Sequence, residues 1–444
     1  MQRNYIRIVL LTAMALLTIT VIVLLAKGSS EEIPEHVIQL EPSSEPIHIR
    51  VLFEQNPATE AQVSWTTTAE GDNHILYFDT EPRGGEASAY RFSSEDIHSG
   101  KYSLRPEEEG MDSWYHHAYM SNLEPNTSYY VMVETDESKS DEYYFITAPD
   151  DDRSVALLMG GDSRVGHSRI EEDNNRRKMN ERMKQLFEEH PHILALAHTA
   201  DYTNRAYWSE LYWWLKDHYE TTTASDNRLL PIIPSRGNHD LDVGFEEKFY
   251  WPNRENDFYY ATQINSETVM IVLNTEISIS GDQKDWLEQT LKEVRPNNRN
   301  VAVMFHKPLY PSVRAYDGSE RRRRAWGPLL EEHGVDFVAV GHDHALKRTV
   351  PILNEKADPN GIVYIGDGGL GVSTREVVSD RWYLQSPGMT KSAYNVHFVE
   401  FNEDHIGITA FGMNGDVLDE FMIPADREER TSYYESILQA VSSR

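Results

Sequence analysis

The chain has 444 residues, enough for two or three domains, and its 42 Lys and Arg against 72 Asp and Glu give a formal net charge of −30. A surface this negative repels polyanions, so binding of long nucleic acid is not expected. Hydrophobic residues at 39% and aromatic residues at 11% provide material for full cores, which excludes global disorder. There is no cysteine. Disulfides, thiolate ligands and thiol nucleophiles are therefore excluded, and any metal must be held by His, Asp, Asn or Tyr.

The N-terminus carries a targeting or anchoring segment. Arg3 and Arg7 precede an apolar run at residues 8–26, and at ~1.5 Å per residue a helix of this length comes close to the ~30 Å of a bilayer core. Residues 1–27 are therefore either an uncleaved membrane anchor or a cleaved signal peptide, and both interpretations stay open. Because the positive charges precede the apolar run, either places the folded part outside the cytoplasm: periplasmic, secreted or membrane-anchored. Residues 28–45 are predicted to be a linker.

Residues 46–149 have the pattern of an antiparallel β-sandwich. Alternating apolar and polar residues predict strands at 47–53, 61–66, 74–78, 129–133 and 143–146, with turn residues and no helical stretch between them. Trp65 is expected to fill the core of the sandwich. The segment Leu-Glu-Pro-Asn-Thr-Ser-Tyr at 123–129 resembles the approach to the tyrosine corner of fibronectin type III domains. A carbohydrate- or partner-binding module is the functional alternative for this half.

After residue 149 the pattern changes to strands that alternate with helices. Apolar strands are predicted at 155–159, 193–197, 230–234, 301–305 and 335–340, and helices at 176–189 and 285–294. We therefore expect an α/β or α+β catalytic domain built on a layered sheet at 150–424. A tail at 425–444 carries one short amphipathic helix at most.

Each of these strands runs directly into a polar cluster. The clusters are Gly160-Gly-Asp-Ser-Arg164, His198-Thr-Ala-Asp-Tyr-Thr-Asn-Arg205, Ser235-Arg-Gly-Asn-His-Asp240, His306-Lys-Pro308 and Gly341-His-Asp-His344. Ligands gather at the carboxyl ends of strands in such sheets. A donor set of Asp, Asn and His without sulfur suits Zn, Fe or Mn.

These five motifs, in this order, resemble those of the calcineurin-type metallophosphoesterases, and within them most closely the purple acid phosphatases. The resemblance extends over residues 46–424 and implies an N-terminal fibronectin type III-like β-sandwich followed by a four-layer αββα sandwich. It also implies two metal ions bridged by Asp201, a pair of cations suited to displacement at phosphorus. The remaining ligands implied for the first metal are Asp162 and His344, and those for the second are Asn238, His306 and His342.

The same resemblance gives roles to two further residues. His239 is implied to be the general acid or a phosphate contact, with Asp240 orienting its ring. Arg205 resembles the arginine that reaches the phosphate in protein Ser/Thr phosphatases; the alternative is that it stacks on a neighbouring ring.

The chain departs from the family pattern at the first metal. Purple acid phosphatases have a tyrosine three residues after the bridging aspartate, where this chain has Asn204, so a ferric-tyrosinate centre is not expected. Other branches have a histidine two residues after the first aspartate, where this chain has Arg164. Three interpretations remain open. Asn204 lends its amide oxygen to the metal, Arg164 fills the space as a phosphate clamp beside a weakly held metal, or the site has degenerated.

The expected activity is metal-dependent hydrolysis of phosphate monoesters of small molecules by a metal-activated hydroxide. A phosphodiesterase on the same site is the enzymatic alternative, and a surface-tethered protein with a vestigial catalytic half is the alternative from another class. His198 is expected to be a buried histidine with satisfied hydrogen bonds. The basic run at 321–324 is expected to form ordinary ion pairs on a helix.

Overall fold

The computed structural model describes residues 36–164, 169–241, 244–252 and 257–442. The predicted anchor or signal at 1–27 therefore lies outside the described residues, as does much of the predicted linker. Within the described parts, no helix is both long enough and apolar enough to cross a membrane.

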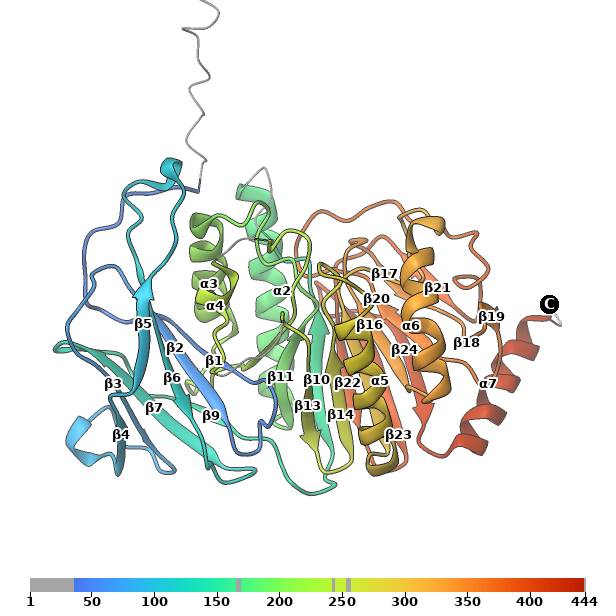
Figure 1. Ribbon diagram of the computed structural model, residues 1–444, viewed down its shortest axis with the longest axis horizontal. Helices are drawn as coiled ribbons and strands as arrows, with labels where there is room; N and C mark the ends of the chain where they lie inside the picture. The colour runs from blue at the N-terminus through green and yellow to red at the C-terminus, as the bar shows by residue number, and fades with distance from the viewer. Residues whose placement is uncertain (1–35, 165–168, 242–243, 253–256, 443–444) are drawn as a thin grey trace, which may run out of the picture.

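The N-terminal half is a β-sandwich, as predicted, and contains no α-helix among its described residues (Figure 1). Its strands pair antiparallel with one another. They are β1 (Ile47–Leu52), β2 (Ala61–Thr67), β3 (His74–Asp79), β4 (Phe92–Ser94), β5 (Ile97–Lys101), β6 (Trp114–Met120), β7 (Ser128–Thr135), β8 (Ser138–Lys139) and β9 (Tyr143–Ile146). The alternation missed β4, β5, β6 and β8, of which β5 and β6 are rich in His and polar residues.

Two predicted features of the sandwich are confirmed. Trp65 is fully buried, and its indole Nε1 donates to the Thr135 hydroxyl at 3.0 Å. The Tyr129 hydroxyl accepts the backbone N–H of Glu124 at 2.8 Å, which is the hydrogen bond that defines a tyrosine corner.

The C-terminal half contains two sheets and the larger helices. Its strands are β10 (Val155–Gly160), β11 (Ile193–His198), β12 (Ile232–Pro234), β13 (Tyr260–Asn265), β14 (Thr268–Val272), β15 (Asn300–Phe305), β16 (Phe337–Val340), β17 (Leu346–Arg348), β18 (Ile352–Leu353), β19 (Lys356–Ala357), β20 (Val363–Gly366), β21 (Met389–Lys391), β22 (Asn395–Phe401), β23 (His405–Gly412) and β24 (Val417–Pro424). Its helices are α2 (Arg169–Glu189), α3 (Trp208–Thr222), α4 (Phe245–Lys248), α5 (Asp282–Val294), α6 (Glu320–Glu332) and α7 (Arg427–Ser442).

Three hydrophobic cores show that these elements form four layers. Along β15, Ala302 and Met304 face the other sheet, whereas Val301, Val303 and Phe305 pack with residues of α5 and α6. Likewise β10 and β11 each turn one face to the opposing sheet and the other to α2. Because side chains alternate along a strand, successive residues of these strands point into different cores. Each sheet is therefore buried on both faces. The predicted αββα sandwich is confirmed.

The two halves share one sheet, which the sequence did not predict. The ten-stranded sheet runs β24-β23-β22-β10-β11-β12-β1-β2-β6-β5. Its two parts join where β1 pairs parallel with β12, Leu52 opposite Ile232. The Phe53 N–H donates to the Ile232 carbonyl at 2.9 Å. The sandwich therefore extends the catalytic sheet instead of standing apart from it.

Candidate metal centre

Four of the predicted ligands directly follow buried strands and have strained backbones. Asp162, Asp201, His342 and His344 have φ of 56°, 60°, 84° and 57°. This left-handed region is costly for residues with a side chain and is tolerated where the surroundings fix it, most often at functional sites. Neighbouring loops fix Asp162, because its N–H donates to the Ala200 carbonyl at 2.9 Å. All four residues lie in the loops beyond the strand ends, where their side chains form the two groups described next.

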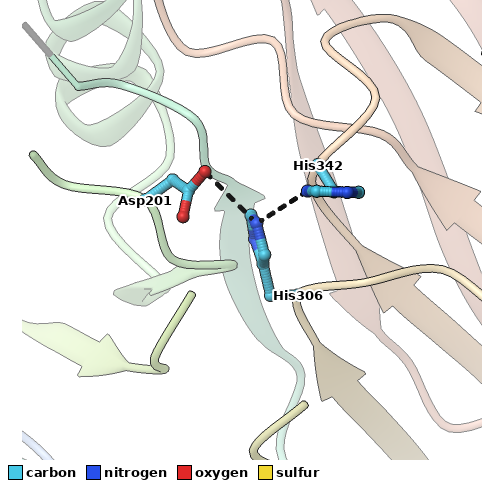
Figure 2. Close-up of side chains that lie close together, drawn as sticks. All are labelled: Asp201, His306 and His342. Atoms are coloured by element: carbon cyan, nitrogen blue, oxygen red, sulfur yellow. Dashed lines mark hydrogen bonds and ion pairs between the residues drawn. The ribbon is translucent and has the colours of Figure 1, made fainter. Parts of the chain in front are cut away.

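Three side chains predicted for the second metal, Asp201, His306 and His342, come together (Figure 2), and Asn238 also lies against His306. His306 Nε2 lies 3.2 Å from Asp201 Oδ2, 3.2 Å from Asn238 Oδ1 and 3.2 Å from His342 Nδ1. Its other ring nitrogen, Nδ1, lies 2.9 Å from the Thr199 carbonyl. That carbonyl requires a proton on Nδ1, so Nε2 is the ring nitrogen at which a metal cation would take the place of a proton.

The electrostatics of this group favour a bound cation. Burial lowers the pKa of His306, but the carboxylates of Asp201 and Asp162 outweigh it and raise that pKa to about 10. Asp201 Oδ2 is buried and accepts no hydrogen bond from the described residues. A buried carboxylate oxygen beside two imidazoles and an amide oxygen is a donor set that a divalent transition metal satisfies. The second set of ligands therefore fits a metal.

A guanidinium, that of Arg164, lies among the side chains predicted to hold the first metal. His344 Nε2 lies 3.1 Å from Asp162 Oδ1. Arg164 lies between His344 and Asn204. Its Nη1 is 3.0 Å from His344 Nε2, and its Nε donates to Asn204 Oδ1 at 3.1 Å. Nη1 is also 4.0 Å from Asp162 Oδ1. Because Arg164 engages the Asn204 amide oxygen, this geometry favours the interpretation in which Arg164 fills the space over the one in which Asn204 is a ligand.

The predicted partner of the His239 ring is wrong. His239 Nδ1 lies 2.6 Å from the Asn204 carbonyl, and Nε2 faces Asp201 Oδ2 at 3.9 Å. The Asp240 carboxylate instead accepts N–H groups of Asp201, Tyr202 and Gly237 at 2.8–3.0 Å. Asp240 therefore holds the backbone that presents Asp201, and the Asn204 carbonyl orients the ring. Burial lowers the pKa of His239, the Asp201 carboxylate opposes that effect, and Arg164 adds to it.

Arg205 contacts a protein carboxylate and a ring. Its Nε lies 3.2 Å from Glu210 Oε1, and its guanidinium carbon lies 5.0 Å from the centre of the Tyr207 ring. The structure thus favours the stacking alternative over the predicted phosphate contact.

His198 is structural, as expected, and so is Tyr202. His198 Nε2 bonds the Ser163 hydroxyl at 2.8 Å and Nδ1 accepts the Ala200 N–H at 3.1 Å, so both ring nitrogens are satisfied. The buried Tyr202 ring stacks on His198 with centroids 4.0 Å apart.

Two residues that position the site were missed. A Cβ at Gly368, whose φ is +86°, would collide with the Asp162 carboxylate, so only glycine fits there. Arg375 donates through Nη1 to the His342 carbonyl at 3.1 Å, and its N–H donates to the His344 carbonyl at 3.0 Å. Gly368 lies in a Gly-Asp-Gly-Gly stretch that offered a signal, whereas Arg375 lies in no strand-end motif.

The fold and site define a class, a layered metallophosphoesterase preceded by a β-sandwich, and comparisons with known proteins place the chain in a family. Residues 166–346 match the calcineurin-like phosphoesterase family, and residues 46–147 match the purple acid phosphatase N-terminal domain. The chain is thus a purple acid phosphatase-like member of the calcineurin-like phosphoesterases and a phosphoester hydrolase.

Individual relatives agree. Purple acid phosphatase 21 of Arabidopsis thaliana is 28% identical over 72% of this chain and 69% of its own length. Purple acid phosphatase 22 of the same plant is 32% identical over 31% of this chain and 36% of its own length. Among solved structures, the purple acid phosphatase PPD1 of yellow lupin (Lupinus luteus) seeds aligns with a TM-score of 0.71 at 16% identity, covering 86% of this chain and 75% of that one. The structure of PhoD aligns with a TM-score of 0.60 at 9% identity, covering 91% of this chain and all of that one. At these identities the structural matches show the fold.

Proposed function

We propose that this chain hydrolyses phosphate monoesters of small molecules outside the cytoplasm, with residues 150–424 as the catalytic unit. The observation that carries the proposal is the group of Asp201, Asn238, His306 and His342, of which Asp201 and His306 are buried and the other two half-buried. Their donor atoms converge where strands of both sheets end. The donor set of this second position is complete, which argues against a vestigial site.

The chain's own residues account for placing a phosphate and moving a proton. Asp201, Asn238, His306 and His342 would hold one metal, and Asp162, His344 and Asp201 would hold the other. Such a pair of cations neutralises charge on phosphoryl oxygens and makes bound water acidic. His239 presents Nε2 toward Asp201 with its ring fixed by the Asn204 carbonyl, so it is placed to donate a proton to a leaving oxygen. Arg164 points a guanidinium into the same space and can bind a phosphoryl oxygen through Nη1.

A pair of histidine variants tests this function. His306→Ala removes the side chain around which the second group converges, so we expect loss of one metal equivalent on elemental analysis and a fall in kcat of about a thousandfold or more. His239→Asn removes the proton donor without removing a ligand. We expect it to keep its metal content while kcat falls by about 10²–10⁴.

The matched control is His192→Ala, a histidine on the protein surface that pairs with Glu400 far from the strand-end motifs. It should keep both metal content and turnover. Full metal content and turnover in His306→Ala would contradict the proposed centre, and metal loss in His239→Asn would contradict the role of His239.

A further inference from the structure

A cavity opens beside the candidate metal centre. It has a volume of about 370 Å³, and its walls include Lys307, Arg314, Ser319, Arg322 and His342. His342 also belongs to the metal group, where its Nδ1 lies 3.2 Å from His306 Nε2. A molecule with one end at the metal centre can therefore extend past His342 into this cavity.

Arg322 enters this cavity, and it has no carboxylate partner in the part of the chain that the structure describes. Its Nη2 donates to the Ser319 hydroxyl at 3.1 Å and approaches the carbonyls of Pro308 and Gly318 at 3.4 and 3.5 Å. No carboxylate of the described residues lies within 4.0 Å of its guanidinium. Burial lowers the pKa of Arg322, although the more distant Glu276 and Asp343 oppose this effect. A half-buried guanidinium bonded only to neutral oxygens retains strong affinity for an anion.

The other three arginines of the basic run at 321–324 have different surroundings from those of Arg322. Arg324 pairs with Glu320, and Arg323 lies 3.2 Å from Glu355 and 3.5 Å over the Tyr316 ring. The Arg324 pair is the predicted kind of ion pair on a helix, whereas Arg323 reaches a carboxylate outside α6, and Arg321 is exposed on the helix surface. Arg322 alone among the four lines the cavity.

The remaining charges around the cavity also favour an anion. Lys307 Nζ lies 2.5 Å from Glu276 Oε2, and Arg314 Nε lies 3.6 Å from Asp343 Oδ1. Three cationic side chains thus line the cavity against two nearby carboxylates. Arg375 is not part of the lining, but it donates to the carbonyl of His342, which is. In a chain with net charge −30, this is a local excess of positive charge, which attracts an anion.

We propose that this cavity binds a second anionic group of the substrate, a phosphate or a carboxylate, while the scissile phosphate lies at the metal centre. The substrate class is then a phosphomonoester that carries another anionic group a few bonds away. Arg322 is the residue that selects it. This inference rests on the proposed function, because it assigns the second end of the molecule hydrolysed there.

The test compares two esters and two variants of the full chain. Phosphoglycerate carries a carboxylate, and in glycerol phosphate a hydroxymethyl group replaces it. We expect Arg322→Gln to lower kcat/KM for phosphoglycerate about tenfold, mainly through KM, and to change kcat/KM for glycerol phosphate less than about twofold. Arg321→Gln removes the same charge one residue away and should change neither. Equal losses for both esters, or equal effects of both variants, would overturn the proposal.

Binding separates failure of this inference from failure of the proposed function. If wild type hydrolyses neither ester, the proposed function is wrong. Calorimetric binding of phosphoglycerate to wild type, Arg322→Gln and Arg321→Gln then decides whether the cavity binds the second anionic group. An affinity about tenfold weaker in Arg322→Gln than in wild type and Arg321→Gln supports it. Equal affinities in all three, or no binding to wild type, overturn it.

Discussion

Arg164 brings a fixed positive charge to a place where the family positions a metal. Its guanidinium contacts His344 and Asn204, and it lies 4.0 Å from Asp162 Oδ1. A cation held by Asp162 and His344 must share the Asp162 carboxylate with Arg164. Two positive charges beside one carboxylate repel each other. We therefore expect the first metal to be held more weakly than the second. Among the described residues, the one guanidinium bonded to a ligand of the second metal is that of Arg375, and it bonds the backbone carbonyl of His342 and not its ring.

Arg164→His tests this at the level of a single residue. The change removes the competing charge and supplies an imidazole at the position where other branches of the family have a ligand. After dialysis that leaves wild type with about one metal equivalent, we expect elemental analysis of the variant to give about two. Calorimetric titration should show the first site tightened by about tenfold or more, the scale on which ligand changes act.

Arg164→Gln is the control, because it removes the charge without adding a good ligand. It should relieve the repulsion and retain less metal than Arg164→His. If wild type holds both metals equally tightly through dialysis, Arg164 does not compete with the first metal and this account of the site is wrong.

At the level of elements, a buried carboxylate holds the connection from β3 to β4. Asp79 ends β3, and its side chain is fully buried. It accepts the Arg91 Nε at 2.7 Å and the Arg83 Nε at 2.8 Å, and it also accepts the N–H groups of Thr80 and Arg91. These hydrogen bonds, with those from Arg91 the largest, lower the pKa of Asp79 below its ordinary value.

Asp79→Asn should therefore destabilise the fold in a pH-dependent way. The folded state favours the ionised carboxylate, so its contribution is fully present above the unfolded pKa of about 4 and is lost as the pH falls through the lower folded value. We expect a loss of about 1–3 kcal/mol in unfolding free energy at pH near 7. The gap to wild type should narrow below about pH 4. Urea denaturation of both proteins at several pH values measures this difference in unfolding free energy.

Asp112→Asn provides a matched comparison. Asp112 pairs with Lys101 at 2.6 Å, but both side chains are about half exposed. Exposed pairs of this kind contribute about 0–1 kcal/mol. An Asp79 variant no less stable than the Asp112 variant at neutral pH would show that the β3–β4 connection does not depend on this carboxylate.

The strands and the loops that follow them also show what can be predicted from the sequence. Strands β10, β11, β15 and β16 were predicted from apolar runs, and their ligands followed because each motif directly succeeds a strand. The roles of Asp240 and Arg205 were not predictable. Asp240 bonds backbone amides of a loop distant in the chain, and Arg205 bonds Glu210 a turn into the next helix. Hydrogen bonds of this kind leave no periodic signal in the sequence.

For the molecule as a whole, the most informative unpredicted contact is the pairing of β1 with β12. Two strand edges far apart in the chain join without any pattern that marks them as partners, because parallel pairing fixes neither a turn nor a spacing. Around the junction, Arg50 Nη2 donates to the Lys248 carbonyl at 3.1 Å, and His117 Nε2 lies 2.9 Å from the Glu247 carbonyl. One hydrophobic core runs from Trp65 in the sandwich to Met304 between the catalytic sheets.

We therefore expect the catalytic half to depend on the sandwich for stability. A chain of residues 150–444 exposes the edge of β12 and part of the shared core, and unpaired strand edges promote association. It should aggregate, or melt at least about 10 °C below a chain of residues 36–444, which keeps all the contacts described here. The longer chain should unfold in one calorimetric transition, because a continuous sheet and core couple the two halves. A soluble 150–444 chain with an unchanged melting temperature, or two separate transitions in the longer chain, would show that the shared sheet joins the halves without coupling their stability.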